Sequence, residues 1–528
     1  SLALKDMGIQ KGDTVGIFAN SSPFWLIFDF AILQVGAISV PIFANISSEN
    51  LNFEIKDSAM KYMFIDSQER LKDIEKENSH LTFITQNFCI KKPKFYNFDW
   101  ILVIGKQICD ATGFTSFEAN PNDIFSIIYT SGNTGTPKGV MLSHKNIVSQ
   151  LHDINKLINL PKGEVALSLL PLAHIFERTV MSYYLSRGIS IYFVDDVLNV
   201  ANLMKVVKPT IMTVVPRLLE KIFNKIKAQI LEKPFFSRII ASLAFSYALK
   251  ENLDKNSILF KIYDKLVYSK FREIFGSKVD KLVSGGAPLS KEIAIFFVNI
   301  GVPVYQGYGM TEFSPVVSTN YPNANKVGSC GKVIPSAQIK INENNELLVR
   351  GDSLMLGYLN QEELTKNTID SEGWLHTGDV AYLDEDGYLF IKSRLKDIFK
   401  TSTGEYVNAV EIEQKLSKNR YIEFAVVISQ NRKYTTALLF VDKEKYENAR
   451  KLNRNLTIEE YYNKDDILKN ISNHINSVNS GLNKWEKIVK FKILTNDISI
   501  ETGELTPSMK ISRSKIEEKY ANIINSMY

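Results

Sequence analysis

The sequence predicts an α/β protein with a large N-terminal domain and a smaller C-terminal one, and three observations support this. Helical and strand-like segments alternate from residue 14 to about residue 320. Shorter alternating strands with tight turns follow, and a mixed segment rich in Lys, Asn and Glu runs to the end. Because such alternation is typical of parallel or mixed sheets covered by helices, we expect these sheets in residues 1–395. A small α+β domain is expected in residues 396–528, with the boundary at Lys396.

The first elements follow from local apolar patterns. The end of a helix, a turn at 11–13 and a strand open the chain. The apolar stretch 24–43 contains Asp29 and Pro41, so a helix followed by a buried strand explains it better than a membrane span does. No transmembrane helix is expected. The clearest later strands are expected at 123–128, 165–172, 189–194, 210–216, 281–286 and 303–309.

Two further segments change the pattern. Residues 218–275 are expected to form a helical insertion, and 221–250 holds six basic residues against the single Glu232. This composition is compatible with peripheral contact to an anionic membrane surface, and equally with a helical hairpin that has a solvated basic face. A β-rich subdomain is expected at 335–393, with a tight turn at 384–387.

Composition excludes several classes of protein. The chain has 528 residues, of which 45% are hydrophobic and 23% charged, as in an ordinary globular protein with more than one domain. A net charge of +5 gives no basis for a nucleic-acid partner. Three scattered cysteines argue against a disulfide framework or a zinc site and favour the cytoplasm. The chain starts at Ser1, and we expect a piece upstream to be missing.

The stretch 129–139, YTSGNTGTPKG, follows an expected strand and has the composition of a phosphate-binding loop. Its glycines let successive N–H groups face one concave side, its hydroxyls add donors, and Lys138 adds a cation. The candidate phosphate-binding residues are Thr130, Ser131, Gly132, Thr134, Gly135 and Lys138. Pro137 and Gly139 break the Walker A pattern, and the dinucleotide fingerprint does not fit either. Taken alone, a flexible surface loop has the same composition.

Seven motifs in chain order resemble those of the adenylate-forming enzymes. They are YTSGNTGTPKG (129–139), LPLAHIFER (170–178), SGGAP (284–288), YGMTE (308–312), WLHTGD (374–379), SRLKD (393–397) and LTPSMK (505–510). Within that superfamily the chain is most similar to long-chain fatty acyl-CoA synthetases, over essentially its whole length. The resemblance implies ATP, Mg²⁺ and coenzyme A, and two steps. A fatty acid would form acyl-AMP with release of pyrophosphate, and CoA would then take the acyl group and release AMP.

The resemblance also implies a nucleotide site. Tyr308 would stack on adenine, and Asp379 would accept the ribose hydroxyls with Arg394 beside it. The other residues carried over are Gly286, Ala287 and Pro288, as a shelf of small residues for the base, and Gly309 and Thr311 next to Tyr308. Without the family, Tyr308 is explained as a core residue, Asp379 as a turn cap and Arg394 as a surface ion pair.

Four residues are the candidates for catalysis. Lys510 would bridge the carboxylate and the α-phosphate, and Lys138 would hold the phosphates. Glu312 would bind Mg²⁺, with Thr130 as a second ligand, because magnesium prefers oxygen ligands. His174 would lie between the acyl and CoA sides, where Phe176 could wall the same space. The alternatives are a core histidine for His174 and a solvated basic helix start for Lys510.

In the second step the resemblance implies rotation of the C-terminal domain about Lys396. Rotation would withdraw Lys510 and bring the loop 400–406 to the site, with Gly404 allowing close passage of pantetheine. This is a hinge motion that changes the reaction rather than only excluding water.

Other functions stay open at this point. An aromatic or medium-chain acid, or an acyl carrier protein as acceptor, would keep the same first step. A catalytically silent nucleotide-binding or membrane-scaffold protein could retain the fold. A kinase or ATPase would release ADP rather than AMP and would need a Walker A or kinase motif set, which the sequence lacks.

Overall fold

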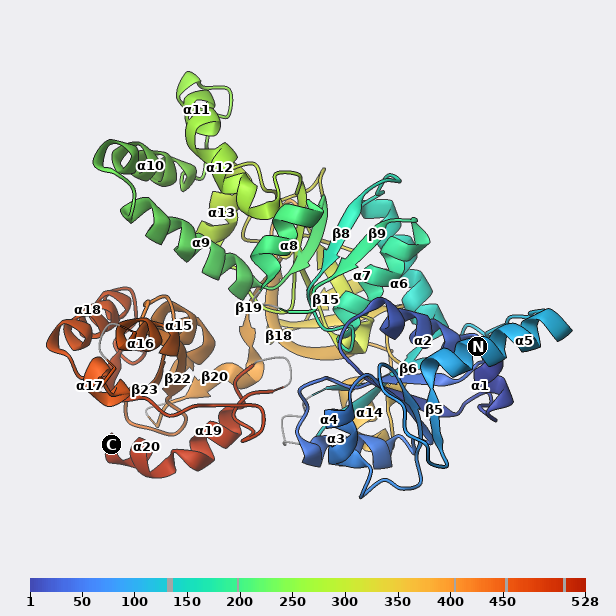
Figure 1. Ribbon diagram of the computed structural model, residues 1–528. Coiled ribbons are helices and arrows are strands. Elements are labelled where there is room, and N and C mark those ends of the chain that lie inside the picture. The colour runs from blue at the N-terminus through green and yellow to red at the C-terminus, as the bar shows by residue number, and fades with distance from the viewer. Residues whose placement is uncertain (131–135, 197–198, 403–404, 452–453, 507–509) are drawn as a thin grey trace. The chain divides into compact units, whose positions relative to one another are not determined.

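The computed structural model (Figure 1) describes residues 1–130, 136–196, 199–402, 405–451, 454–506 and 510–528. The chain forms two compact units. The first unit contains residues 1–341, 348–377 and 382–390, and the second contains 342–347, 378–381 and 391–528. Lys396, the predicted hinge, lies in a 3-10 turn, Leu395–Asp397, and its hinge role stays a prediction.

The first sheet of unit 1 has eight strands in the order β17-β7-β6-β2-β1-β3-β4-β5. Strands β1 to β6 pair in parallel, whereas β7 and β17 join antiparallel, so the sheet is mixed. The strands are β1 Thr14–Phe18, β2 Ile38–Pro41, β3 Tyr62–Ile65, β4 Thr82–Thr85, β5 Phe95–Asn97, β6 Ile124–Thr130, β7 Lys138–Ser143 and β17 Gly357–Tyr358. Most of β1 and all of β2 are buried, as in parallel strands covered on both faces.

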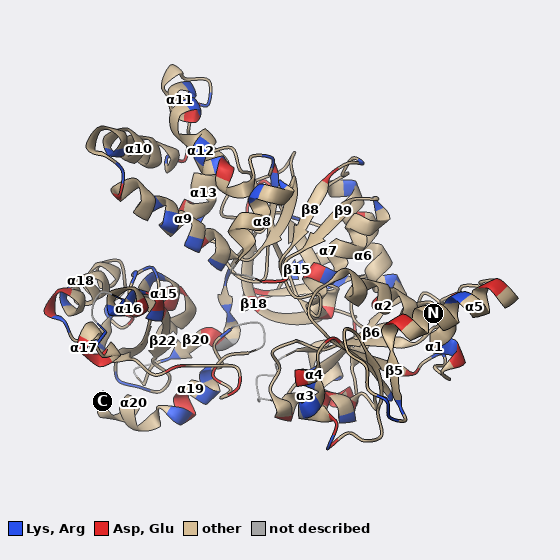
Figure 2. Ribbon diagram, viewed as in Figure 1, with Lys and Arg blue, Asp and Glu red and all other residues tan. Residues whose placement is uncertain are grey.

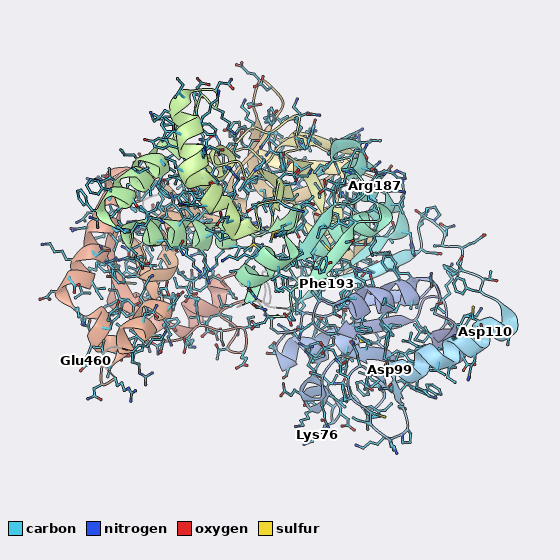
Figure 3. The ribbon with its side chains drawn as sticks, turned by 45° about the horizontal axis from the view of Figure 1, so that its top comes forward. Lys76, Asp99, Asp110, Arg187, Phe193 and Glu460 are labelled. Carbon is cyan, nitrogen blue, oxygen red and sulfur yellow. The ribbon has the colours of Figure 1, made fainter. Side chains whose placement is uncertain are left out.

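Of the six helices of this part, the first two lie where the sequence predicts helical residues. The stretch 24–43 forms a helix followed by a buried strand, as expected, because Ser22 caps α2 by accepting a hydrogen bond from the Trp25 amide. The helices are α1 Leu2–Asp6, α2 Pro23–Leu33, α3 Ser48–Asp57, α4 Gln68–Ile74, α5 Phe98–Thr112 and α6 His144–Leu157. Asp99 and Asp110 mark the two ends of α5 in Figure 3.

The second sheet of unit 1 has seven strands in the order β14-β13-β12-β11-β10-β8-β9. Strands β8 to β12 are parallel, and β13 and β14 are antiparallel. The strands are β8 Val165–Ser168, β9 Ser190–Phe193, β10 Ile211–Val214, β11 Lys281–Ser284, β12 Val304–Gly309, β13 Val316–Thr319 and β14 Lys332–Val333. The five strands expected here from the sequence are present. Each is somewhat shorter than its expected range, and β12 ends at the expected residue, Gly309. Helices α7 Ile175–Ser186, α8 Val200–Val207 and α13 Lys291–Asn299 alternate with them.

Between β10 and β11 the chain forms a group of helices, seen beside α13 in Figure 1. They are α9 Pro216–Leu231, α10 Phe235–Ala248, α11 Ile258–Tyr263, a π turn at Asp264–Tyr268, α12 Ser269–Arg272 and a 3-10 turn at Glu273–Phe275. Three aromatic rings, from Phe223, Phe245 and Phe296, pack with centroids 4.8–5.1 Å apart and tie α9, α10 and α13 together. The group thus shares the core of the second sheet.

Shorter strands follow. They form a four-stranded sheet in the order β15-β16-β18-β19, to which both units contribute residues. Its strands are β15 Ala337–Ile341, β16 Glu346–Gly351, β18 Leu375–Leu383 and β19 Leu389–Arg394, and α14 Glu362–Thr368 lies between β17 and β18 in the chain. The turn between β18 and β19 closes with a hydrogen bond from the Gly387 amide to the Asp384 carbonyl, and Gly387 has φ +76°.

The rest of unit 2 is built on a three-stranded sheet. Strand β22 Ile422–Ile428 is antiparallel to β23 Thr435–Val441, which is parallel to β24 Ile488–Leu494. Alternate residues serve two cores. Leu439 packs on the side of α15 and α18, and Leu438 on the side of α19 and α20. The other elements are β20 Ile398–Lys400, β21 Tyr406–Asn408, α15 Ala409–Leu416, α16 Lys443–Arg450, α17 Ile458–Tyr462, α18 Asp465–Ser480, α19 Arg513–Lys519 and α20 Ala521–Ser526.

A search of the described residues finds no helix with the length and apolar character needed to cross a bilayer.

Candidate active site

The predicted phosphate-binding loop lies in the chain between two strands that pair antiparallel, β6 and β7. Thr130, the last residue of β6, pairs with Lys138, the first residue of β7, and Tyr129 pairs with Gly139. The strand predicted at 123–128 therefore begins one residue later and ends two residues later than expected, so Tyr129 and Thr130 belong to it. The predicted residues Ser131, Gly132, Thr134 and Gly135 lie outside the described part of the chain.

Tyr358 joins two predicted site residues that are distant in the sequence. The Lys138 Nζ lies 5.2 Å from the centroid of the Tyr358 ring. The Tyr358 hydroxyl donates a hydrogen bond of 2.9 Å to Glu312 Oε1. Burial and the Glu312 charge raise the pKa of Tyr358, so the hydroxyl remains a donor at neutral pH. The predicted phosphate cation and the predicted metal ligand thus share one buried tyrosine.

Strand β17 fixes the position of this tyrosine. Tyr358 pairs with Val140 on β7, and its amide donates to Thr365 Oγ1 at 2.9 Å. Nearby, the Met355 amide donates to the Glu312 carbonyl at 2.9 Å. These backbone bonds hold Tyr358 and Glu312 against the hairpin. Sequence reasoning missed Tyr358, because no motif marks it.

Glu312 follows the end of β12, in the 3-10 turn Thr311–Phe313. Tyr308 is half-buried near the end of β12 and pairs with Ser318. A β-bulge separates it from Gly309, where a Cβ would lie 2.1 Å from the Pro315 carbonyl oxygen. Only glycine fits this close approach of two backbone segments. The bulge therefore sets the direction in which the chain leaves the sheet toward Thr311 and Glu312.

The motif at 284–288 leaves the neighbouring strand, β11. Gly285 lies against Phe176, whose ring atoms would be 3.2 Å from an added Cβ. The predicted base shelf, Gly286, Ala287 and Pro288, is exposed. Gly286 has φ +81°, a conformation that favours glycine. The structure thus places Phe176 against this motif, and its role as a wall of the acyl and CoA space stays a prediction.

His174 caps the start of α7. Its Nδ1 accepts a hydrogen bond of 3.2 Å from the Phe176 amide, which places the ring proton on Nε2. The ring meets Phe43 edge to face, with centroids 6.4 Å apart. This histidine is therefore held by the helix terminus, at the edge of the first unit's core, and its predicted place between the acyl and CoA sides stays a prediction.

The two residues at the end of the same motif are buried ionisable side chains that anchor α7. Glu177 accepts hydrogen bonds from Ser168 and Thr213, and burial raises the pKa of Glu177 to about 7. Arg178 pairs with Asp29 at 2.6 Å and donates to Ser126 at 2.7 Å. These contacts tie α7 to β8, β10, α2 and β6. Glu177 and Arg178 therefore have a structural role within the motif 170–178. The sequence alone does not distinguish this role from a catalytic one.

In unit 2, three predicted residues lie together. The Arg394 Nε is 3.1 Å from Asp379 Oδ1, and Asp379 is only 3% exposed. Lys510 is exposed as a whole residue, but burial of its amino group and the positive charge of Arg394 lower the pKa of Lys510, while Asp379 opposes this shift. The segment at Asp379 is held by Glu346, which accepts a 3.0 Å hydrogen bond from the Gly378 amide.

Lys510 lies before α19 rather than in it. Its carbonyl accepts from the Thr506 amide at 2.8 Å, and its amide donates to Thr506 Oγ1 at 3.1 Å. Arg513, which begins the helix, pairs with Glu413 at 2.6 Å. Arg513 and Lys515 thus do lie at a basic helix start, which begins three residues after Lys510, and the catalytic role of Lys510 stays a prediction. Gly404 falls outside the described residues.

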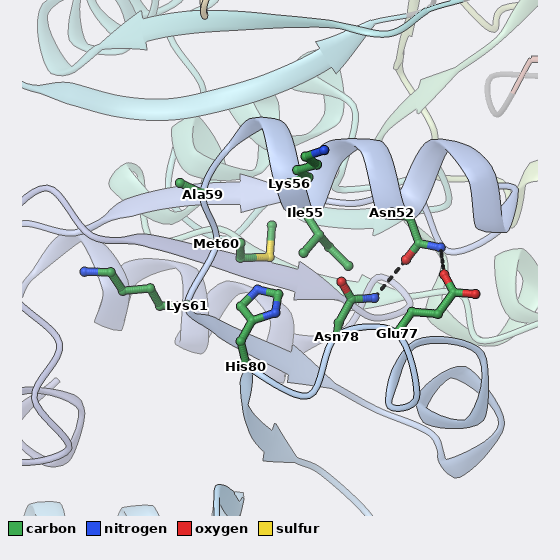
Figure 4. A pocket seen from close by; sticks show the side chains of 9 residues that line it. All are labelled: Asn52, Ile55, Lys56, Ala59, Met60, Lys61, Glu77, Asn78 and His80. Atoms are coloured by element: carbon green, nitrogen blue, oxygen red, sulfur yellow. Dashed lines mark hydrogen bonds between the residues drawn. The ribbon is translucent and has the colours of Figure 1, made fainter.

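Two further observations concern ligands. Within the described ranges no three His, Cys, Asp or Glu side chains group as a metal site. A pocket of about 530 Å³ in unit 1 has none of the predicted site residues in its wall (Figure 4). It is lined by Asn52, Ile55, Lys56, Ala59, Met60, Lys61, Glu77, Asn78 and His80.

Known proteins match the chain from end to end. The profile of the AMP-binding enzyme matches residues 1–359, and that of the AMP-binding enzyme C-terminal domain matches residues 396–528. A long-chain-fatty-acid–CoA ligase of Mycobacterium tuberculosis is 31% identical over 540 residues, covering 100% of this chain and 90% of the relative. One from Homo sapiens is 31% identical over 570 residues, covering 99% and 78%.

Solved structures share the fold at low sequence identity. An anthranilate CoA ligase in complex with anthranoyl-AMP has a TM-score of 0.74 at 21% identity, covering 99% of this chain and 90% of that one. The adenylation domain of a carboxylic acid reductase from Segniliparus rugosus has a TM-score of 0.77 at 18% identity, covering 100% and 84%. The architecture is thus that of the adenylate-forming enzymes. By the matches along its whole length, the chain belongs to the AMP-binding enzyme family.

Proposed function

We propose that this protein is an AMP-forming ligase that joins a long-chain fatty acid to coenzyme A. The observation that carries the proposal is the grouping of Lys510 with Arg394 and Asp379, because it sets a lysine of lowered pKa beside a buried carboxylate. Likeness over the whole chain to proteins named as long-chain-fatty-acid–CoA ligases supports the choice of acid and acceptor.

In the first step, an oxygen of the fatty-acid carboxylate attacks the α-phosphorus of ATP. The bond from this phosphorus to the bridging oxygen of the β-phosphate breaks, and pyrophosphate leaves. Lys510 would hold the carboxylate and the α-phosphate together, and Lys138 with the hairpin loop would hold the departing phosphates. Preorganised donors of this kind act where charge develops, which is commonly the largest part of catalysis.

Glu312 and Thr130 are the proposed magnesium ligands. A carboxylate and a hydroxyl are oxygen ligands of the type that Mg²⁺ prefers, and magnesium usually takes one or two carboxylates together with substrate phosphates. The residues therefore fit the ion without a larger acidic cluster. When bound, Mg²⁺ supplies positive charge to the phosphate oxygens. Tyr358 acts as a positioning residue, because its hydroxyl bonds to Glu312 Oε1.

The proposed nucleotide contacts are those that the family motifs imply. Tyr308 would stack on the adenine, and Asp379 would accept the ribose hydroxyls with Arg394 beside it. The exposed residues Gly286, Ala287 and Pro288 would support the base, with Gly309 and Thr311 alongside. Each of these assignments rests on the motif in which the residue lies.

In the second step, the sulfur of CoA attacks the carbonyl carbon of the acyl-adenylate, the bond to the phosphate oxygen breaks, and AMP leaves. In this proposal, rotation of the C-terminal domain about Lys396 switches the enzyme from the first step to the second. Gly404 would then give passage to pantetheine, and His174 would lie between the acyl and CoA sides.

Peripheral contact with the cytoplasmic face of a membrane, through 221–250, also belongs to this proposal. Long-chain fatty acids dissolve in bilayers, so an enzyme that lies on one meets its substrate there. The excess of basic residues in this segment supports such contact.

Mass spectrometry of the products tests the proposal. Purified protein is incubated with ATP, Mg²⁺ and a panel of fatty and aromatic acids, with and without CoA. We expect AMP and a long-chain acyl-CoA only when CoA is present. Lys510→Ala is expected to lose adenylation by about 10²- to 10³-fold, whereas Lys515→Ala, whose Nζ lies 3.5 Å from Glu518 Oε2, is expected to keep it.

Other products would point to other functions. An acyl-adenylate that CoA does not consume would contradict the acceptor and indicate an acyl carrier protein. Conversion of aromatic acids alone would contradict the assignment of long-chain fatty acids as the substrates. If no acid gives AMP, the ligase proposal fails and a silent nucleotide-binding protein takes its place.

A further inference from the structure

The outward faces of α10 and α11 are apolar. On α10 the exposed side chains include Phe235, Phe236, Ile239, Ile240 and Leu243, with Phe236 79% exposed and Leu243 56% exposed. Their spacing of one and four residues places them in one stripe along the helix. A second stripe on α11 and the following π turn has the same spacing and contains Ile258, Leu259, Ile262 and Leu266.

This concentration is unusual for the molecule. Of 28 large apolar side chains that are exposed among the described residues, ten lie between Leu231 and Leu266. The opposite face of α10 is already satisfied, because Ala241, Ala244 and Phe245 are buried in the core of unit 1. The outer stripe therefore does not serve the packing of this helix. Contiguous apolar surface of this kind marks an interaction site.

The same segment carries the positive charge of the protein. Residues 216–275 contain twelve Lys and Arg against six Asp and Glu, a net charge of +6, while the whole chain has +5. The remaining residues together are therefore at −1. Figure 2 shows α10 almost wholly tan, with blue segments on α9 and α11. An apolar stripe with basic residues around it matches the interface of an anionic bilayer, which offers acyl chains beneath negative headgroups.

We propose that the stripes of α10 and α11 insert into the interface of an anionic lipid bilayer. The inference specifies the surface for the membrane contact in the proposed function and rests on that part of it. Aromatic and aliphatic side chains of the stripes would enter the acyl boundary. Lys233, Arg238 and Lys261, on or beside these helices, would stay at the headgroups, as long basic side chains do.

Vesicle sedimentation tests the proposal on the full-length protein. The probes are vesicles of phosphatidylcholine alone and of equal parts phosphatidylcholine and phosphatidylglycerol. We expect binding to the anionic vesicles only, weakened by salt. Phe236→Ser with Ile240→Ser is expected to lower the partition constant by about a hundredfold, because each large apolar side chain removed from the acyl boundary costs about a factor of ten.

A matched control is the pair Leu102→Ser and Val103→Ser on α5, which are also exposed apolar residues, at 51% and 55%. This control is expected to bind as the wild type does. Since the mutated side chains are exposed in both pairs, the variants should fold, and circular dichroism with a melting curve checks that they do.

Three results would overturn the inference. Equal binding to neutral vesicles would refute the anionic lipid, and undiminished binding of the α10 pair would refute the surface. A wild-type dimer in light scattering that the α10 pair dissociates would show that a second copy covers the stripe. Vesicle binding is measured without ATP or acid, so its failure and that of the ligase proposal are separate.

Discussion

Replacing Tyr358 by Phe tests whether one buried hydroxyl positions Glu312 for its proposed binding of Mg²⁺. The substitution removes the 2.9 Å hydrogen bond to Glu312 Oε1 and keeps the ring 5.2 Å from the Lys138 Nζ. Tyr358 is only 5% exposed, so the added space is a single oxygen in a packed site. The change therefore isolates the hydrogen bond from the cation–ring contact.

The expected effect follows from the charge of the acceptor. A hydrogen bond to a charged group is worth about 1.5–3 kcal/mol, whereas one between neutral groups is worth about 1 kcal/mol. Glu312 is partly exposed, so water replaces part of the lost bond, and the lower end applies. Since about 1.4 kcal/mol is a factor of ten, we expect kcat/KM for adenylation to fall about tenfold and the Mg²⁺ requirement to rise.

The assay is exchange of labelled pyrophosphate into ATP, which reports the first step without CoA. The matched control is Tyr268→Phe, which loses a buried hydrogen bond of 2.8 Å to the Ala244 carbonyl in the helical insertion. We expect both variants to lower the melting temperature, but only Tyr358→Phe to slow exchange. Wild-type exchange and an unchanged Mg²⁺ dependence in Tyr358→Phe would refute the coupling of Tyr358 to Glu312.

Two further predictions concern pH. Burial and Arg394 lower the pKa of Lys510, and its proposed role needs the ammonium form, so the rate of adenylation should decline at a lower pH than it would with an ordinary lysine. Lys510→Arg, which stays charged, should lack this decline. The same alkaline decline in the pH–rate profiles of both proteins would contradict the assignment. Burial raises the pKa of Glu177 from about 4.5 to about 7, so its contribution to folding is present below pH 4.5 and is lost as the pH rises to about 7. That loss is about 3 kcal/mol, and urea unfolding of Glu177→Gln should lack this slope; the same slope in both proteins would refute it.

Much of the fold could be predicted from the sequence. The helix and strand within 24–43 and the strands from 165 to 309 follow from short apolar runs between turn residues, and the structure contains them. The alternation of elements also predicts mixed sheets covered by helices. These features depend on local patterns, which a sequence displays directly.

Local sequence patterns could not predict which strands pair with one another. The loop at 129–139 was expected to leave a strand, but nothing in it shows that the chain returns antiparallel to the same strand. Tyr129 was included in the loop, although it is a strand residue whose hydroxyl bonds to Asp57 at 2.8 Å. Glycine-rich composition hides such a strand end, because pairing depends on the partner and not on the loop.

The candidate site shows the same limit. Motifs identified Lys138, Glu312, Asp379 and Arg394, and the contact of Arg394 with Asp379 was expected. Tyr358 lies 220 residues from Lys138 in the chain, and Glu346 holds the Gly378 amide from another strand. Both act through contacts that only the folded sheet creates. Their residue types are too common in strands to stand out beforehand.

The hairpin has an electrostatic consequence for the phosphates. A phosphate-binding loop that runs into a helix gains the positive end of the helix macrodipole, about half an elementary charge, from the backbone itself. The chain after 131–137 enters β7 instead, and a sheet has almost no net dipole. The charge that the backbone does not provide must then come from side chains and ions. In the proposed function this charge comes from Lys138, at the first position of the returning strand, whose full charge on a flexible side chain would follow the pyrophosphate as it departs.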